Sequence, residues 1–468
     1  MKIYLIIPAN ESLRVKNAEA SIPKRKMLRF SVLSLTTIAA LTPEKHEVVI
    51  CDENVQVIAY NIDADLVGIS FMTGLANRAY ELARHYRNRG IVTVAGGFHP
   101  TLNTEEAKEH FDIVVSGEAE DTWPTVLEDV EKGNYKAVYQ SRFCASLDHV
   151  PTPRRDLLTS TRKYYITTDA VQTGRGCRHA CKFCSVTAFF KNNHRSRPLE
   201  KVFEEVKSAE RNFMFVDDNI IADREFALTL FKKMIPLKKH WVSQCSIKIA
   251  DNMELLRYAA LAGCIGLFIG IESIDSSNLS MMDKSFNKPE EYRKKIRTIN
   301  RAGIGVQAGM IVGLDSDDKG VFQRNLKFLQ GANIGALQLA ILTPHPGTPL
   351  REEFEKNGRI IDNNWEHYDY RHTVIQPKQM TPQDLQDGAD WLYVQYYRLD
   401  RIVLRTIRAL FAVGLFPAIL TWRLNMTYRY DNRCLKLTGK NPAEAGRYFP
   451  VKRLGGWFKR SVLESVSK

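Results

Sequence analysis

The sequence lacks an apolar run long enough to cross a lipid bilayer. Its longest run, residues 409–422, has 14 residues and includes Gly414 and Pro417, whereas a spanning helix needs about 20. We expect a buried helix there; an interfacial helix on a membrane is the alternative, because arginines flank the run. A secretory signal is also lacking, since the apolar residues 3–8 are followed at once by polar Asn10.

Signatures of disulfide scaffolds and of nucleic-acid binding are absent as well. Eight cysteines in a 468-residue chain without a secretory signal do not suggest a disulfide framework. The net charge of +13 comes from scattered lysines and arginines without a zinc-finger or RNP motif, so we expect no nucleic-acid partner. We expect a cytoplasmic protein, with peripheral contact at the inner membrane face as the alternative.

What is present indicates an α/β protein of two or three domains. In residues 1–148, strands are expected at 2–7, 47–51, 66–71, 91–95 and 112–115, and helices at 76–89 and 122–132. This order is typical of a doubly wound, Rossmann-like parallel sheet, which binds ligands beyond the carboxyl ends of its strands. The candidate binding residues at those ends are Ser70, Thr73, Gly96, Gly97, Gly117 and Glu118.

A linker at residues 149–168, containing VPTPRRD, leads to a second alternating region at 169–355. Strands are expected there at 170–173, 212–216, 241–246, 265–271, 306–312 and 337–342, separated by helical patterns. Six such units predict a partial (β/α)6 TIM barrel, whose catalytic residues lie at the carboxyl ends of the strands. Residues 356–468 are expected to form a mainly helical C-terminal region, with helices at 384–408 and 410–428.

Three cysteines follow the first expected barrel strand. Cys177, Cys181 and Cys184 have the spacing C-x3-C-x2-C. Three thiolates on one loop can bind three irons of a [4Fe–4S] cluster and leave the fourth iron open to a substrate or cofactor. A structural zinc site is the alternative, but it requires four ligands, and His179 is poorly placed to be the fourth.

The cysteine loop, with aromatic Phe183 before its last cysteine, resembles that of the radical S-adenosylmethionine (SAM) superfamily. The resemblance implies that the open iron chelates SAM, with Phe183 nearby. It implies that SAM is cleaved to a 5′-deoxyadenosyl radical, which abstracts hydrogen from an unactivated carbon. It also implies an electron donor such as a flavodoxin or ferredoxin.

Segments at later strand ends extend the resemblance to the SAM site. Glu272 and Ser273, in GIES at 270–273, resemble the segment that meets the ribose and methionyl part of SAM. Asp217 and Asp218 take the place of the more usual Gly-Gly-Glu that contacts the SAM amino group. Ile311 is expected against adenine, with core packing as the alternative.

A doubly wound domain followed by this barrel is similar to the cobalamin (B12)-binding radical SAM class. The loop TPHPGTP at 343–349 closely resembles that of members with a cobalamin domain, as do segments 96–100 and 117–120. The resemblance implies cobalamin at the N-terminal strand ends given above. The D-x-H-x-x-G motif, which supplies a histidine to cobalt in methionine-synthase-type domains, is absent. His99 is therefore expected to be structural, and a domain that no longer binds cobalamin is an alternative.

The leading hypothesis is a cobalamin-dependent C-methyltransferase acting on a hydrophobic small molecule, such as a lipid, isoprenoid or tetrapyrrole. The alternatives are a ring-forming or C–C coupling enzyme of the same class, such as a porphyrin cyclase, and a non-catalytic cobalamin- or redox-sensing module. The catalytic candidates are His345 in the proline-rich loop, and His367 and Tyr368 in the titratable segment 365–372. An interdomain contact is the alternative for that segment.

Overall fold

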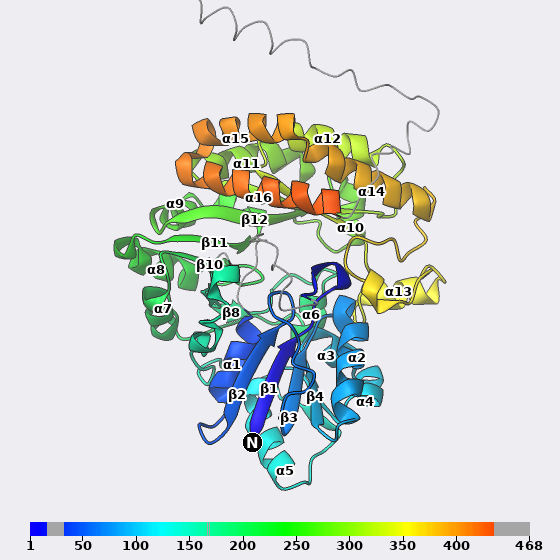
Figure 1. Cartoon of the computed structure of the whole chain (residues 1–468). Helices are drawn as coiled ribbons and strands as arrows, with labels where there is room; N and C mark the ends of the chain where they lie inside the picture. The colour runs from blue at the N-terminus through cyan, green and yellow to red at the C-terminus, as the bar shows by residue number, and fades with distance from the viewer. Residues whose placement is uncertain (16–31, 166, 168, 435–468) are drawn as a thin grey trace, which may run out of the picture.

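The computed structural model describes residues 1–15, 32–165, 167 and 169–434. An N-terminal α/β unit lies below a second α/β unit, and the C-terminal helices pack on the second (Figure 1). This architecture confirms the predicted fold class. The domain boundaries at residues 148, 168 and 355 stay predictions.

Six parallel strands form the N-terminal sheet, in the order β2-β1-β3-β4-β5-β6. They are β1 (Lys2–Ile7), β2 (Glu47–Asp52), β3 (Leu66–Ser70), β4 (Val92–Gly96), β5 (Ile113–Ser116) and β6 (Val138–Gln140). Because side chains alternate along a strand, Ile3 and Leu5 pack with α1 (Leu33–Leu41) and α5 (Trp123–Glu131). On the opposite face, Tyr4 and Ile6 pack with α2 (Ala76–Arg87) and α4 (Thr104–His110). The sheet is therefore doubly wound.

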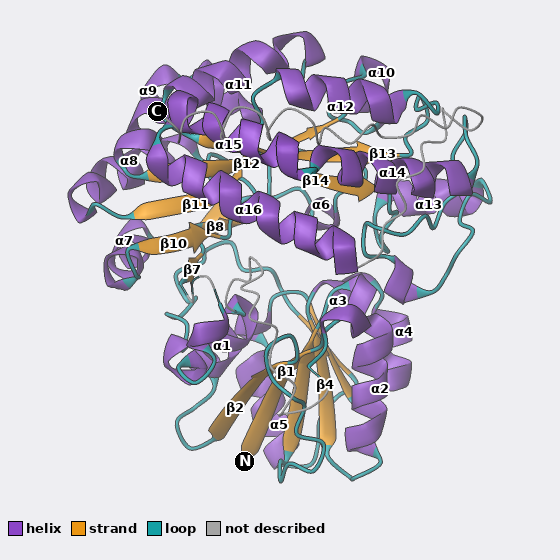
Figure 2. Cartoon of the chain, turned by 45° about the horizontal axis from the view of Figure 1, so that its top comes forward, coloured by secondary structure: helices purple, strands orange, loops and turns teal. Residues whose placement is uncertain are grey.

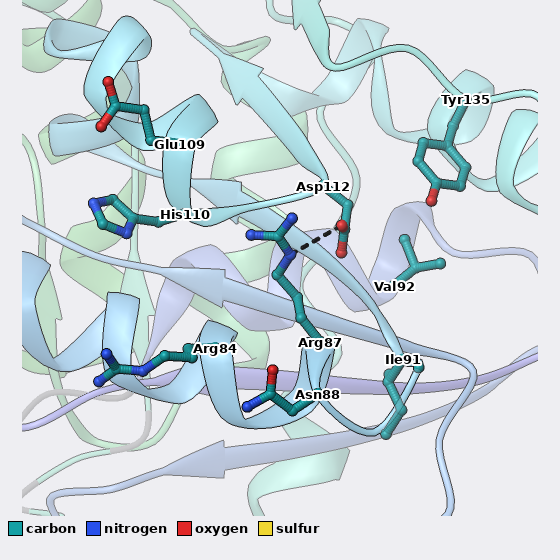
Figure 3. A pocket seen from close by; sticks show the side chains of 10 residues that line it. Arg84, Arg87, Asn88, Ile91, Val92, Glu109, His110, Asp112 and Tyr135 are labelled. Carbon is teal, nitrogen blue, oxygen red and sulfur yellow. Dashed lines mark hydrogen bonds and ion pairs between the residues drawn. The ribbon is translucent and has the colours of Figure 1, made fainter.

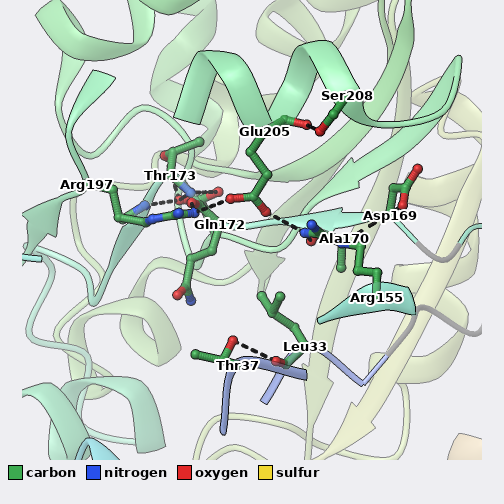
Figure 4. Close-up of polar contacts among 12 residues, drawn as sticks. Leu33, Thr37, Arg155, Asp169, Ala170, Gln172, Thr173, Arg197, Glu205 and Ser208 are labelled. Carbon is green, nitrogen blue, oxygen red and sulfur yellow. Dashed lines mark hydrogen bonds and ion pairs between the residues drawn. The ribbon is translucent and has the colours of Figure 1, made fainter. Parts of the chain in front are cut away.

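The linker is fixed to the second unit by a buried ionic cluster (Figure 4). Glu205 of α7 (Leu199–Ser208) is only 3% exposed, and it binds both Arg155 of the linker and Arg197. Arg197 Nη1 lies 2.8 Å from Glu205 and 2.8 Å from the Gln172 carbonyl oxygen. Arg155 also donates to the carbonyl of Ala170 in the first barrel strand. Arg155 also lies 3.9 Å from Asp169, so two carboxylates oppose the two guanidinium groups, and the cluster holds the linker against that strand.

The second sheet is also entirely parallel, in the order β14-β13-β12-β11-β10-β7. Its strands are β7 (Ala170–Val171), β10 (Asn212–Phe215), β11 (His240–Cys245), β12 (Cys264–Glu272), β13 (Gly305–Val312) and β14 (Ala336–Ile341). Helices α7, α8 (Arg224–Met234), α9 (Met253–Leu261), α11 (Tyr292–Arg301) and α12 (Val321–Gly331) join successive strands (Figure 2). The predicted six-unit partial barrel is thus confirmed.

The C-terminal region is helical, but its breaks differ from those predicted. The helices are α14 (Pro382–Tyr396), α15 (Leu399–Val413) and α16 (Leu415–Cys434). The expected helix at 384–408 is interrupted because Arg398 has an extended backbone, and the next break falls at Gly414, whose φ is +88°. Within the described residues, no helix combines the length and apolarity needed to span a bilayer.

Helix α14 covers the free edge of strand β14. The Tyr393 hydroxyl accepts a hydrogen bond from the Leu339 N–H at 3.0 Å and donates one to the Leu339 carbonyl at 2.8 Å. Tyr397, one turn later, binds the N–H and carbonyl of Leu337 in the same way. These hydroxyls satisfy edge groups that would otherwise be free to pair with another strand.

Helix α16 packs on the face of the second sheet opposite to the connecting helices. Trp241 stacks on Phe231 of α8 on the outer face, with ring centroids 5.1 Å apart. The inner face and α16 together enclose a cavity of about 370 Å³. Glycines allow this close approach: a Cβ at Gly266 would lie 2.9 Å from Leu420, and one at Gly335 would lie 2.9 Å from Thr421.

Candidate functional site

Cys177, Cys181 and Cys184 lie on one loop between the short hairpin strand β8 (Gly174–Arg175) and α6 (Ser185–Phe190). Burial raises the pKa of each thiol, that of Cys181 to about 12. Cys177 and Cys184 add to the rise at Cys181, Cys184 adds to it at Cys177, and Asp218 adds to it at Cys184. The three thiols therefore form one electrostatically coupled group. In the described part of the chain, no three His, Cys, Asp or Glu side chains converge on a single metal ion. A [4Fe–4S] cluster fits this donor set, because each thiolate binds a different iron.

A lysine that the sequence analysis did not select lies beside these thiols. Lys284 Nζ is 2.5 Å from Glu272 Oε1 and 5.9 Å from the ring centroid of Phe183. Burial raises the pKa of Cys181, and the positive charge of Lys284 partly offsets this rise. Glu272 has a φ of +62°, at the point where the β12–β13 register shifts. Such a left-handed conformation is unusual outside glycine and often marks a functional position.

The two predicted aspartates have different surroundings. Asp217 is buried and accepts hydrogen bonds from the Thr173 and Gly174 N–H groups, at 3.0 and 2.8 Å, and from the Thr173 hydroxyl. It thus ties the start of the cysteine loop to β10. Burial raises its pKa to about 7. Asp218 accepts one hydrogen bond from the Gly176 N–H at 3.2 Å and interacts electrostatically with Cys177 and Cys184. Asp218 is therefore the better placed of the two to face a ligand at the cysteines.

Ser273 and Ile311 lie at the carboxyl edge of the second sheet, as predicted. Ser273 is buried, and its hydroxyl accepts a hydrogen bond from the Asp275 N–H at 3.1 Å. Ile311, near the end of β13, is 8% exposed. The structure therefore gathers all the sequence-predicted SAM residues at the edge that carries the cysteines.

A cavity of about 230 Å³ lies between the two α/β units. From the N-terminal unit it is lined by residues that follow β1, β2, β3 and β4, including Thr73 and Phe98. From the second unit it is lined by Ser185, His345 and Tyr370. Ser185 directly follows Cys184, so the N-terminal strand ends and the cysteine loop border one space. A second cavity, of about 860 Å³, shares Tyr370 and several other lining residues with the first.

The predicted cobalamin residues divide into two groups. Thr73 lines the interdomain cavity, and a Cβ at Gly96 would meet no atom of the described residues within 4 Å. Gly97 and Gly117 have φ of +104° and +98°, a left-handed backbone conformation that favours glycine. A Cβ at Gly97 would lie 2.8 Å from the Phe71 carbonyl oxygen and 3.2 Å from Ser70 Oγ. Gly96 and Thr73 thus leave room for a ligand, while Ser70, Gly97 and Gly117 are closely packed.

Glu118 forms ion pairs with two arginines of the protein. Its carboxylate lies 2.9 Å from Arg175 and 2.8 Å from Arg195; Glu118 and Arg195 are buried, and the Arg175 side chain is 11% exposed. Both arginines belong to the β8–β9 hairpin, β9 being Arg195–Ser196, which precedes and follows the cysteine loop. The sequence suggested a cobalamin contact, but in the structure this carboxylate joins the two units. Two arginines so distant in sequence could not be recognised as its partners.

The three catalytic candidates also differ. His345 is 6% exposed, lines the interdomain cavity, and its Nε2 has no hydrogen-bond partner among the residues that the structure describes. Burial lowers its pKa to about 4, so its imidazole is neutral. His367 lines the larger cavity, and its Nδ1 lies 2.5 Å from Asp362 Oδ2. Tyr368 also borders the smaller cavity. Its hydroxyl accepts a hydrogen bond from Arg351 at 2.6 Å and donates one to the Asp362 carbonyl oxygen at 2.8 Å.

Tyr370 is a candidate that the sequence analysis missed. Its φ is +66°, and its ring lies 4.8 Å from that of His345. Tyr370 is 40% exposed as a whole, but its hydroxyl end is desolvated, which raises the pKa of the phenol to about 12, and the nearby Cys184 contributes. Tyr370 lines both cavities, so it lies where the cysteine loop, His345 and the larger cleft meet. Only its unusual backbone distinguishes it, and this cannot be read from sequence.

A further cavity, of about 530 Å³, lies at the opposite edge of the N-terminal sheet (Figure 3). Arg87 and Asp112 form an ion pair at 3.1 Å there, near the amino ends of β4 and β5. Arg84, Glu109 and Tyr135 also line it. Because it borders the amino ends of the strands, it is separate from the site at the cysteines.

Comparison with known proteins agrees with this geometry. Residues 171–329 match the radical SAM superfamily, and residues 29–127 match the B12 binding domain. Bacteriochlorophyllide d C-8(2)-methyltransferase of Chlorobaculum tepidum is 30% identical over 80% of this chain and 87% of its own length. Bacteriochlorophyllide d C-12(1)-methyltransferase of the same organism is 26% identical over 86% of this chain and 89% of its own length.

The fold also has a close counterpart among solved structures. The radical SAM methyltransferase TsrM from Kitasatospora setae, with cobalamin and a [4Fe–4S] cluster bound, superposes with a TM-score of 0.65. The match covers 93% of this chain and 100% of that one at 13% identity, so it concerns the fold alone. With the three cysteines, the paired sheets and the relatives together, the chain belongs to the radical SAM superfamily, among the enzymes with a B12-binding domain.

Proposed function

We propose that this enzyme is a cobalamin-dependent C-methyltransferase that acts at an unactivated carbon of a hydrophobic substrate. The observation that carries the proposal is the shared interdomain cavity, lined by Thr73 after β3 and by Ser185 after the last cysteine. A radical source and a methyl carrier must both reach the same substrate carbon, so their sites must border one space. In this family the cluster and SAM supply a 5′-deoxyadenosyl radical, and cobalamin carries the methyl group.

The chain's own residues supply binding and orientation. We assign Cys177, Cys181 and Cys184 to the cluster, and Phe183, Asp218, Glu272, Ser273 and Ile311 to SAM. Asp217 acts indirectly, by fixing the cysteine loop. Ser70, Thr73, Gly96, Gly97 and Gly117 stay our proposed cobalamin contacts. The neutral imidazole of His345 offers an unpaired nitrogen at the cavity, where it can hold or accept a proton.

Two observations support a hydrophobic substrate. The cavity between the second sheet and α16 is lined mainly by apolar side chains such as Val242, Phe268 and Leu424, with glutamines among them. Both methyltransferase relatives described above are named for bacteriochlorophyllide, a tetrapyrrole. The proposal also includes an electron donor such as a flavodoxin or ferredoxin, and a cytoplasmic location, with peripheral contact at the inner membrane face as the alternative.

The test uses anaerobically reconstituted protein with SAM bearing a deuterated methyl group, cobalamin, a reductant and a panel of tetrapyrroles and isoprenoids. We expect 5′-deoxyadenosine, S-adenosylhomocysteine and a product that carries the labelled methyl group. Cys181→Ala should abolish all three, whereas Cys144→Ala, on a cysteine outside the loop, should not. Iron-loaded protein that forms no 5′-deoxyadenosine with any substrate would contradict the proposal.

The product separates this function from the alternatives. A substrate that loses hydrogen without gaining the labelled methyl group would indicate ring formation or coupling. Bound cobalamin without SAM cleavage would indicate a sensing module.

A further inference from the structure

Helices α15 and α16 carry the largest group of exposed apolar side chains in the described residues. On α15 they recur every three to four positions, as expected for one stripe of a helix, and α16, which packs against α15, carries further ones. Phe411 is 86% exposed and Leu415 60%. The exposed apolar residues of the two helices, called the α15–α16 surface below, are Leu399, Val403, Leu404, Ile407, Leu410, Phe411, Leu415, Phe416, Ile419 and Trp422.

The charge of these two helices is predominantly positive. Residues 398–434 contain seven arginines and two aspartates, and one of these, Asp400, is paired with Arg398. Arg408 and Arg423 are exposed among the apolar residues. The sequence that follows, residues 435–468, contains eight lysines and arginines and two glutamates. An apolar surface with a basic surround complements an anionic lipid surface.

Helix α16 links this surface to the inside of the barrel. Pro417, Leu420 and Leu424 line the cavity of about 370 Å³, together with Val242 and Phe268 of the sheet. Phe416, Ile419 and Trp422, from the same helix, are exposed. One helix therefore separates an apolar cavity from an exposed apolar surface.

We propose that the α15–α16 surface docks on an anionic lipid bilayer, which brings the barrel cavity next to the membrane. The docking does not depend on the reaction. Delivery of a hydrophobic substrate from the lipid, past α16 and into the cavity, rests on the proposed function. A bilayer fits better than the chain's own residues 435–468, because that segment has the same sign of charge as the surface it would cover. A second copy of the chain would place like charges together in the same way.

The test is co-sedimentation of full-length, cluster-loaded protein with phosphatidylcholine vesicles, with and without phosphatidylglycerol. We expect binding to the anionic vesicles that weakens with added salt, because screening reduces the attraction to the headgroups. Ile407→Glu and Phe411→Glu should each lower the affinity about tenfold, since each removes a side chain that the bilayer would bury. Met253→Glu, on a residue that is 62% exposed on α9, is the matched control and should bind normally.

The contact is located by fluorescence quenching with brominated lipids. In a Trp457→Phe background, quenching should persist through Trp422 and disappear when Trp422→Phe is added. No binding to either vesicle would overturn the proposal. A loss of vesicle affinity in Met253→Glu as large as in Phe411→Glu would overturn it too. The parent protein could instead bind no vesicles and self-associate in their absence, with Phe411→Glu abolishing the self-association. That result would identify a second copy of the chain as the occupant of the surface and would also overturn the proposal. None of these readouts requires catalysis, so docking can fail while the proposed function stands.

Discussion

Arg195 donates both terminal nitrogens of its guanidinium to the carboxylate of Glu118, each at 2.8 Å. The pair joins the loop after β5 of the N-terminal sheet to the hairpin that carries the cysteine loop. Arg175, from the same hairpin, shares this carboxylate and also binds Glu120. The two cofactor-binding units are thus linked by buried charges at the point where their sites meet.

Replacing Glu118 should therefore destabilise the protein. Glu118→Ala leaves two buried guanidinium groups with one carboxylate fewer, and we expect the free energy of unfolding to fall by about 3 kcal/mol. Chemical denaturation checks this value. Glu128→Gln, which removes an ion pair whose side chains are two-thirds exposed, should have a much smaller effect. A change in cobalamin affinity without loss of stability would instead favour the ligand contact that the sequence suggested.

Removing the Tyr393 hydroxyl should expose the edge of the second sheet. Tyr393→Phe leaves the N–H and carbonyl of Leu339 without their partner. We expect a loss of about 2 kcal/mol in the free energy of unfolding, because unsatisfied buried polar groups carry the full cost of desolvation. Thermal unfolding of full-length protein measures this loss. Tyr135→Phe, on an exposed tyrosine, should unfold like the parent. If both variants lost the same stability, protection of the sheet edge would not be the cause of the loss in Tyr393→Phe.

Removing the positive charge at Lys284 should make Cys181 less acidic. Burial raises the pKa of Cys181, and Lys284 opposes that rise, so Lys284→Gln should raise the pKa further. In cluster-free protein the thiol should then react more slowly with iodoacetamide at a given pH, since only the thiolate reacts. Lys284→Arg should retain the parent rate. Lys248→Gln removes a nearby charge that lies 4.6 Å from the Phe286 ring, and it should leave Cys181 unchanged.

Buried His345 should make the folded state sensitive to mild acid. Burial lowers its pKa from 6.5 to about 4, so between these values the unfolded chain binds the proton more readily. Stability contributed by the neutral imidazole is present above pH 6.5 and is lost as the pH falls toward 4. Urea unfolding of cluster-free protein across this range should show a decline that His345→Gln reduces. An identical decline in the variant would assign the acid sensitivity to other groups.

The fold was predictable because its elements are repetitive and strongly patterned. The long apolar strand of residues 264–272 is fully specified by local sequence, whereas β6, three residues with one buried, carries too little signal. The break at Arg398 was missed because the residues around it are all compatible with a helix. Its extended backbone lets α15 turn back toward α11, and such tertiary demands do not appear in local periodicity.

The site was predictable where chemistry depends on adjacent residues and not where it depends on distant ones. The cysteine spacing is a property of one loop, so the sequence identifies it directly. Lys284 becomes part of the site only because β12 and the residues after it bring its amino group to Glu272. Tyr370 and the arginine partners of Glu118 likewise depend on contacts between segments far apart in the chain.

The glycines under α16 have an evolutionary consequence. Gly266, Gly305 and Gly335 lie near the amino ends of their strands, and at each a Cβ would lie within 4 Å of α16. The cysteines, Glu272 and Lys284 lie at the other end of the same sheet. A larger residue at Gly266 or Gly335 would press on Leu420 or Thr421 of α16 and change the size of the chamber, and the opposite end of the sheet would keep its geometry. The dimensions of this chamber can thus vary while the residues around the cysteines stay the same.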